Sequence, residues 1–412
     1  MQSVFSWVDF SENDKNRMHE IINSLSDPNT RDELGIAPIR DSFANMMFPG
    51  TNTLQTRIKY MLFVPWLYKI VEKEKIAAQS AAERIRELEV DLIESLKKNN
   101  SDQNGIIGQL SGANITRTPA DIYWTGLREW GILKGNFSRR DFHDILKIYH
   151  KSSAEDLILE NEYQLENILN YKDKIQLWDP AVIESPEKFT QKADLNLNYY
   201  QADYLKEKIK KNCSQTVLAE IIDLPYDQGT DFVWEYNLIN HLDQKLYNQV
   251  EHAHHFSELI FGAHLLYNLM LAQKDENTNQ ELEETYLKLI NEWKYEIKKN
   301  KKYLKSWDLN DFWLTAAVND FKLKSFVNSW YELAVNDNYL NQIENSDTAR
   351  ELIADRERLI KGQRARLFSQ KYLEKWGGAS SASKLDFRWH IAETFIRDIK
   401  FALEGDEIDA QS

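Results

Sequence analysis

One short stretch of this chain marks both ends of a helix and so constrains the fold more than any other feature. Thr118 can cap a helix, Pro119 suits its first position, and the charge of Asp121 meets the positive helix end. Gly131 supplies a left-handed stop, and an apolar pair and a glycine-asparagine turn follow. Helix, stop, short strand and turn in this order predict a winged-helix-like domain over residues 102–180.

The remaining segments favour helices. Apolar residues recur at helical spacing, whereas strand-like alternation is scarce. We therefore expect a mostly α, multi-helical fold whose only β-structure is the small wing of the winged-helix-like insert. With 412 residues, the chain is too long for one ordinary core. The expected domains are an N-terminal helical domain (1–101), the winged-helix-like domain (102–180) and a C-terminal helical domain (181–412) with a basic segment (350–400).

Individual helices are predicted from apolar spacing and from turn residues between the segments. Asn52 with Gln55 resembles a capping box, so a helix is expected to start near residues 51–53 and to be kinked or ended by Pro65. The other expected helices cover residues 12–25, 39–47, 66–98, 202–211, 216–222, 232–252, 255–273, 279–300, 308–314, 321–335 and 348–359.

Charge and cysteine content limit the possible functions. The net charge of −14 argues against indiscriminate nucleic-acid binding. The acidic excess lies in residues 151–349, however, and residues 350–400 are net basic. Only Cys213 is present, so a disulfide framework within one chain is excluded and a reducing, cytoplasmic location is expected. Neither an export signal nor a membrane span is predicted, and we expect no membrane partner.

Two groups of basic residues are candidates for contacting nucleic acid. In the winged-helix-like insert, Arg128 would project from the exposed face of the helix. Lys134, Arg139 and Arg140 would lie around the glycine-asparagine turn. In the C-terminal segment, basic residues alternate with aromatic ones, as in single-strand or backbone binding, although an amphipathic helix with internal ion pairs explains the same pattern. The candidate residues are Arg117, Tyr123, Arg128, Lys134, Arg139, Arg140, Arg364 and Arg366.

A polar stripe is expected on an otherwise apolar helix. It consists of His254, Ser257, Glu258, His264 and Asn268. Buried polar groups need partners, so a hydrogen-bonded structural network explains the stripe. His254 and Glu258, four residues apart, could instead hold a metal ion, but no third ligand and no zincin spacing are found. We therefore predict no metal ligand, no catalytic residue and no cofactor, and the network interpretation is preferred.

Several short motifs resemble those of a known family. They are FSWVDF (5–10), RDELG (31–35), FPGT (48–51), QTR (55–57), FVPW (63–66), IYW (122–124), LR with WGI (127–132), LLYNLMLA (265–272) and LDFRW (385–389). On these motifs the chain is similar, over nearly its whole length, to a family of uncharacterised bacterial proteins. The resemblance implies genes placed beside helicases and nucleases in mobile defence clusters, and hence an accessory role in anti-phage immunity.

Three functions follow as hypotheses. The first is a non-enzymatic accessory subunit of a bacterial anti-phage defence complex, which binds double-stranded DNA and joins other subunits such as a helicase or a nuclease. The second is a protein-interaction scaffold without nucleic-acid contact. The third is a metal-dependent hydrolase that uses the stripe of His254, Glu258 and His264.

Overall fold

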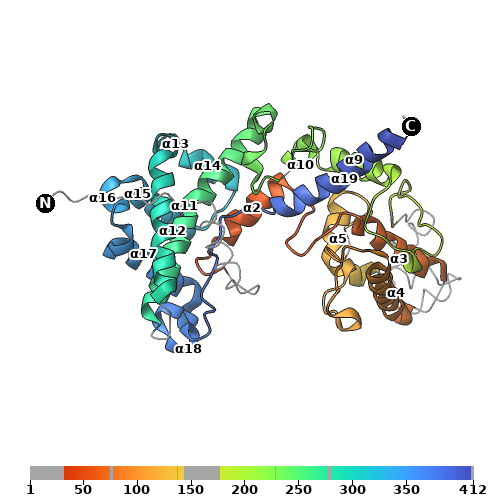
Figure 1. Ribbon diagram of the computed structural model, residues 1–412, viewed down its shortest axis with the longest axis horizontal. Coiled ribbons are helices and arrows are strands. Elements are labelled where there is room, and N and C mark those ends of the chain that lie inside the picture. The colour runs from red at the N-terminus through yellow and green to blue at the C-terminus, as the bar shows by residue number, and fades with distance from the viewer. Residues whose placement is uncertain are drawn as a thin grey trace, which may run out of the picture. The chain divides into compact units, whose positions relative to one another are not determined.

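The computed structural model describes residues 32–409, except 75–77, 137, 143–176, 228 and 276–279. These residues are mostly helical, as the sequence predicts (Figure 1). Within these ranges no sheet is found, and an isolated antiparallel bridge joins Leu133 and Trp178. No helix of the described residues is long and apolar enough to cross a membrane. The helix expected over residues 12–25 lies outside the described residues.

The chain divides into two compact units. The first unit comprises Met1–Phe43 and Asn248–Phe387, and the second comprises Ala44–Tyr247 and Arg388–Ser412. Each unit therefore combines two stretches that lie far apart in the sequence, whereas the sequence analysis grouped consecutive residues. Helices α2 (Ala37–Met47) and α11 (Gln244–Lys274) each begin in one unit and end in the other.

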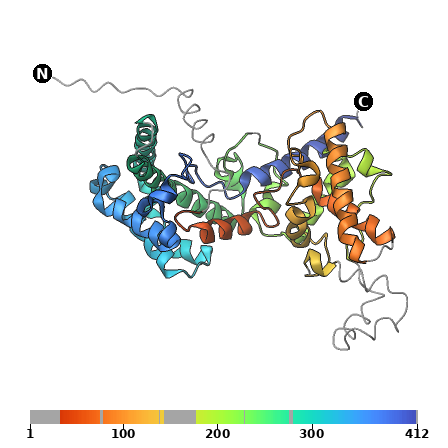
Figure 2. The same ribbon diagram turned by 90° about the horizontal axis from the view of Figure 1, so that it is seen from below.

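The second unit is a helical assembly around a core of aromatic rings. Its other helices are α3 (Tyr60–Glu74), α4 (Ala78–Asn99), α5 (Pro119–Glu129), α9 (Tyr199–Asn212), α10 (Val217–Ile221) and α19 (Trp389–Asp409). Helix α3 packs against both α4 and α5, and α19 runs along α9 (Figures 1 and 2). The rings of Tyr68, Trp124, Phe142 and Trp178 contact one another at this core, with centroids 4.8–6.1 Å apart.

The predicted start and stop of α5 are confirmed. The Asp121 carboxylate accepts a hydrogen bond from the Thr118 backbone N–H at 3.0 Å, and the Thr118 hydroxyl accepts one from the Asp121 N–H at 3.4 Å. This is a complete capping box. Gly131 has φ 64°, the left-handed conformation that ends a helix at little cost for glycine.

The predicted β-wing is wrong for the described residues. After Gly131 the chain does not fold back as a hairpin but pairs with a segment far along the sequence. The Lys134 N–H donates to Leu177 O, and the Asp179 N–H donates to Ile132 O, both at 2.8 Å. Leu133 and Trp178 are both buried by this bridge, so apolar burial selects the distant partner. The described part of the insert thus contains the 3₁₀ turn Gly112–Asn114, helix α5, a bridged loop and the helical residues 139–142.

The helix predicted to start at residues 51–53 begins later, at Tyr60, and continues through Pro65 to Glu74. Asn52 and Gln55 do form a local turn, in which the Asn52 N–H donates to Gln55 Oε1 at 2.9 Å. However, the Asn52 side-chain amide donates to Ile122 O of α5 at 2.7 Å. The polar residues that resembled a helix cap therefore attach a loop to α5.

Besides the first part of α2 and most of α11, the described residues of the first unit form seven further helices. They are α12 (Gln280–Lys299), α13 (Lys301–Ser306), α14 (Leu309–Ala316), α15 (Phe321–Val335), α16 (Asp337–Leu340), α17 (Asp347–Lys361) and α18 (Gln370–Leu373). The helices predicted over residues 279–300, 308–314, 321–335 and 348–359 are confirmed within two residues at each end. Residues 232–243, predicted as helix, contain only the short 3₁₀ turns Val233–Glu235 and Ile239–His241.

Helix α11 packs closely on α12 and α15. The indole N–H groups of Trp293 and Trp330 donate to the backbone oxygens of Glu258 and Leu259, both at 2.8 Å. A Cβ atom at Gly262 would lie 2.2 Å from the Trp293 ring. Helices α11 and α12 can therefore approach this closely only because residue 262 is glycine.

Candidate functional site

Three arginines gather at the N-terminal end of α5. The Arg139 guanidinium donates to the Thr118 hydroxyl at 3.0 Å and to Asp121 Oδ1 at 2.6 Å. This contact brings Arg139, and with it the neighbouring Arg140, to the segment that carries Arg117. Arg117 and Arg140 are exposed. The structure thus brings together three of the predicted residues, Arg117, Arg139 and Arg140, which we call the arginine cluster.

Charged side chains of α4 hold the segment that carries Arg117 and the start of α5. Arg86 of α4 donates to the backbone oxygens of Ala113 and Ile115 and so fixes the segment that leads to Arg117. Glu89, also on α4, is buried and accepts a hydrogen bond from the Ala120 N–H at 2.9 Å. Burial raises the pKa of Glu89, although this hydrogen bond from the helix N-terminus opposes the rise.

Arg128 and Lys134 lie near the opposite end of α5. The Arg128 guanidinium donates to Asn136 Oδ1 at 3.0 Å, and Lys134 Nζ lies 3.6 Å from Asp179 Oδ1. Asp179 also pairs with Lys208 and accepts a hydrogen bond from Tyr204 at 3.0 Å. An 11-residue helix is about 16 Å long, so these two residues are about that far from the arginine cluster.

Tyr123 does not lie on the surface. Its side chain is fully buried, its hydroxyl donates to Arg57 O, and it accepts a hydrogen bond from the Thr56 N–H, both at 2.8 Å. A ring in this position holds α5 against the loop before α3 and cannot stack on an external base. Among the six candidates in the insert, Tyr123 is therefore a positioning residue.

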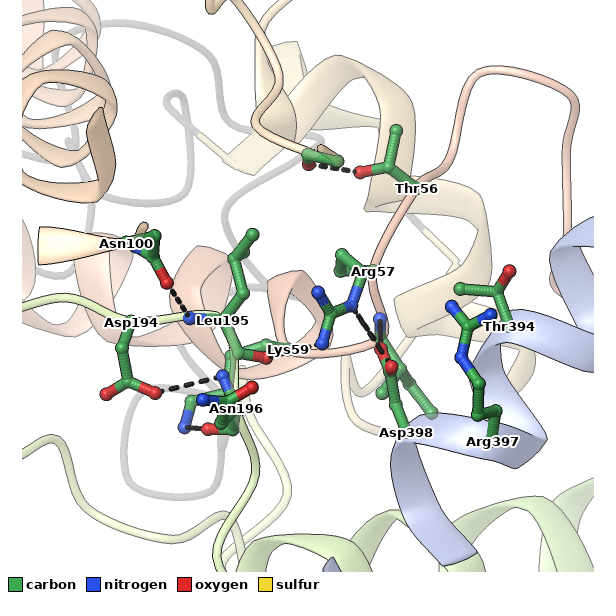
Figure 3. A network of polar contacts seen from close by, with 12 residues as sticks. Thr56, Arg57, Lys59, Asn100, Asp194, Leu195, Asn196, Thr394, Arg397 and Asp398 are labelled. Carbon is green, nitrogen blue, oxygen red and sulfur yellow. Dashed lines mark hydrogen bonds and ion pairs between the residues drawn. The ribbon is translucent and has the colours of Figure 1, made fainter. Parts of the chain in front are cut away.

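A buried polar network fixes this loop to α19 and to the segment before α9. Arg57 Nε lies 2.8 Å from Asp398 Oδ2, and Lys59 Nζ donates to Gln201 Oε1 at 2.6 Å and to Asn196 O (Figure 3). Burial lowers the pKa of Lys59 to about 8, and Asp194 partly offsets this effect. The network ties together segments more than 130 residues apart, so its role in the second unit is structural.

A pocket beside α19 was not found by sequence reasoning. It measures about 550 Å³ and includes His390, Glu393, Thr394, Arg397 and Phe401. With 100° per residue, these five positions share one face of α19, and this spacing was the available signal. Tyr226 also lines the pocket, and its hydroxyl donates a hydrogen bond to Glu393. Burial, together with that carboxylate, raises the pKa of Tyr226.

The two candidates from the C-terminal segment differ in their surroundings. Arg364 is exposed. Arg366, by contrast, has a side chain only 17% exposed, donates to Ser380 Oγ at 2.6 Å and lies 3.4 Å from Glu33 Oε1. Arg366 therefore stabilises the first unit. Both residues belong to that unit, whereas the arginine cluster belongs to the second.

The polar stripe of α11 faces a segment of the same chain. Ser257 Oγ donates to Leu385 O at 3.0 Å, and Asn268 exchanges two 2.8 Å hydrogen bonds with the backbone of Ser380. Glu258 pairs with Lys384, and its Oε1 atom lies 3.9 Å from His254 Nε2. These contacts support the network interpretation, because the stripe fastens residues 380–385 to α11.

His264 is the exception within the stripe. The residue is buried, and neither ring nitrogen has a hydrogen-bond partner among the residues that the structure describes. Burial lowers its pKa to about 4, so the ring is neutral at pH 7. In the described ranges, no group of three histidine, cysteine or acidic residues is placed to hold a metal ion.

Comparison with known proteins adds a family. The model of a family of unknown function, DUF6361, matches residues 2–402. This chain belongs to the DUF6361 family. The match covers α5, the pocket beside α19 and the stripe of α11, so all three are parts of the DUF6361 region. No curated protein and no solved structure matches the chain.

Proposed function

We propose that this DUF6361 chain is a DNA-contacting adaptor subunit of a bacterial anti-phage defence complex. The arginine cluster at the start of α5 carries the DNA part of the proposal. There, Arg139 reaches Thr118, and the exposed Arg117 and Arg140 flank that contact. The resemblance described above supports the defence complex and its helicase or nuclease partner.

The geometry suits phosphate more than base recognition. The guanidinium groups of Arg117 and Arg140 suit phosphate oxygens. The Arg139–Asp121 pair is partly exposed, so separating it for a phosphate costs little. Arg128 and Lys134, about one helix length away, would contact a second stretch of backbone. The proposal is therefore sequence-independent, salt-sensitive binding of double-stranded DNA.

The test is a fluorescence-anisotropy titration with a labelled DNA duplex at several salt concentrations. The double variant Arg117→Glu/Arg140→Glu reverses the charge at two positions and should weaken binding to every DNA sequence. It should also reduce the slope of log affinity against log salt concentration (the salt slope) by about 1.8, or 0.9 for each lost phosphate contact. Arg139 is left in place because it also holds the start of α5. The matched control, Lys245→Glu/Lys322→Glu, changes the charge equally at two other exposed lysines and should bind like the wild type.

Equal affinities for the two double variants would refute the arginine cluster as a DNA site. The protein-interaction scaffold would then be the better hypothesis. One observation favours it: Leu314 and Phe321, seven residues apart at the α14–α15 junction, have 78% and 81% of their surface exposed. Large apolar side chains at such exposure are typical of protein contact surfaces when they cluster.

The hydrolase hypothesis has less geometric support. Glu258 is paired with Lys384, and the ring of His264 is buried. A substrate would have to displace residues 380–385 to reach the stripe.

A further inference from the structure

The first unit has a second concentration of positive charge, which lies outside all the candidate residues discussed so far. Five lysines occur within eight residues where α12 ends and α13 begins, and we call them the lysine cluster: Lys298, Lys299, Lys301, Lys302 and Lys305. All except Lys301 are exposed. Lys301 pairs with Asp337 of α16, and the pKa of Asp337 is lowered first by Lys301 and then by Lys305 and Lys298. All three lysines therefore act on Asp337, an acidic residue of the same unit.

Helix stability does not explain the whole lysine cluster. Lysines in the last turn of a helix, such as Lys298 and Lys299 in α12, interact favourably with the helix dipole. Lys301 and Lys302, however, occupy the first turn of α13, where a positive charge is unfavourable. The pair with Asp337 accounts for Lys301, whereas Lys302 is exposed and would be stabilised by an anionic partner.

Two exposed tyrosines accompany the lysines. Tyr295 and Tyr303 have 60% and 67% of their surface exposed. Tyr303 also forms part of a pocket of about 260 Å³ within the first unit. The pocket is open to solvent at the surface of the first unit. A planar ring could enter the pocket past Tyr303 while the rest of the ligand stays among the lysines.

The walls of the pocket are aromatic and are held in fixed orientations. The ring of His255 stacks on that of Trp307, with centroids 5.4 Å apart and an interplanar angle of 18°. Trp307 Nε1 lies 2.9 Å from His252 Nδ1, and His252 Nε2 lies 3.1 Å from Asp311 Oδ2. The indole N–H can only donate, so His252 Nδ1 accepts and its Nε2 carries the hydrogen that Asp311 accepts.

The pocket offers several acceptor atoms, although Asn248, Ser306 and Tyr303 on its lining can also donate. His255 Nδ1 lies 2.6 Å from Glu251 O and must donate to it, so Nε2 of the neutral ring is an acceptor. The acidic residues Glu251, Asp308 and Asp311 also line the pocket. Asp308 Oδ1 already accepts from the backbone N–H groups of Asn310 and Asp311, and Asp311 Oδ2 accepts from His252. Acceptors suit the amino groups of adenine, cytosine and guanine, whereas thymine and uracil carry no amino group.

From these observations we infer that this end of the first unit binds single-stranded nucleic acid, with phosphates on the lysine cluster and one amino-bearing base in the pocket beside Tyr303. A duplex keeps its bases stacked, so only an unpaired base can enter. Positive charge beside exposed aromatic rings is the usual arrangement for single-strand binding. This inference goes beyond the proposed function, because it uses other residues, another unit and another form of nucleic acid.

The test measures the affinity of the full chain for labelled 12-mers of deoxyadenosine, deoxycytidine, thymidine and adenosine. We expect Tyr303→Ala to weaken binding by about fivefold or more, the lower limit for one base stacked on an aromatic ring. Tyr303→Phe keeps the ring and should restore binding. Lys302→Glu/Lys305→Glu should reduce the salt slope by about 1.4, since each phosphate on a single strand contributes about 0.7. The adenine and cytosine strands should bind more tightly than the thymine strand.

Two controls separate this site from the arginine cluster. Arg117→Glu/Arg140→Glu and Lys245→Glu/Lys322→Glu should both leave single-strand affinity unchanged. Comparison of the adenosine and deoxyadenosine strands shows whether RNA or DNA is preferred. The inference is overturned if the Tyr303→Ala and Lys302→Glu/Lys305→Glu variants bind like the wild type, or if thymine strands bind as tightly as adenine strands. It is equally overturned if poly-glutamate displaces the strands at matched charge, because the lysines would then select an acidic protein segment.

Discussion

At the residue scale, burial and pairing decide which polar side chains can reach a partner. Tyr123, Arg366 and Ser257 are all polar or basic, yet their polar groups form hydrogen bonds within the chain. Sequence spacing placed the stripe residues correctly on one helix face, because the 3.6-residue period is a local property. It could not show that residues 380–385, more than 110 positions away, supply the hydrogen bonds.

The lowered pKa of His264 leads to a prediction of how the stability of the folded protein depends on pH. Its pKa is about 4 in the folded protein and about 6.5 in an unfolded chain. The unfolded state therefore takes up more protons between these values, and stability should fall as the pH decreases from about 6.5 to about 4. Asp32 and Arg40 are the charged groups that act on this ring, in opposite directions.

The corresponding variant is His264→Leu. A buried ring without a partner can be replaced by an apolar side chain at little cost, so the melting temperature at pH 7.5 should be unchanged or higher. The variant should also lose less stability than the wild type between pH 7 and pH 5. Thermal unfolding at several pH values measures both effects, and identical pH profiles for the two proteins would show that His264 does not cause the response.

At the element scale, the sequence predicted helices well where caps and periodicity agreed. Helix α5 is the clearest case, since its cap and its glycine stop are both local. The wing failed because Leu133 pairs with Trp178, a contact that no local pattern reveals. The capping-box pattern at Asn52 was misread because the same hydrogen bonds also form a turn, and only the contact to Ile122 distinguishes the two.

The docking of α5 depends on one glycine. A Cβ atom at Gly126 would lie 2.5 Å from Gly50 O and 2.6 Å from Met61 Cε. Alanine normally stabilises a helix by about 1 kcal/mol relative to glycine. Here a fixed backbone oxygen is in the way, so an overpacking cost of about 1–3 kcal/mol should exceed that gain.

Chemical denaturation tests this prediction with a matched pair of variants. Gly126→Ala should lower the free energy of unfolding. Gly405→Ala lies in helix α19 with no atom within 4 Å of its added Cβ, so it should be neutral or stabilising. If both variants gain stability, α5 does not pack against residue 50 as described.

At the scale of the whole molecule, long-range contacts build each unit. Arg57 and Asp398 pair across 341 positions, and Arg356 donates to Leu34 O across 322. Contacts over such distances leave no periodic pattern in the sequence. Neither the two units nor the pocket beside α19 could therefore be predicted in full. The lysine cluster, in contrast, is visible as a charge run, and only its position beside a pocket required the structure.

The central claim is that double-stranded DNA contacts the start of α5. The most direct measurement is hydrogen–deuterium exchange of the full chain with and without a DNA duplex at low salt. We predict slower exchange in residues 113–121 and 138–142 on addition of DNA, and no such change in the Arg117→Glu/Arg140→Glu variant. Unchanged exchange in these two segments at saturating DNA would contradict the account, whatever other segments became protected.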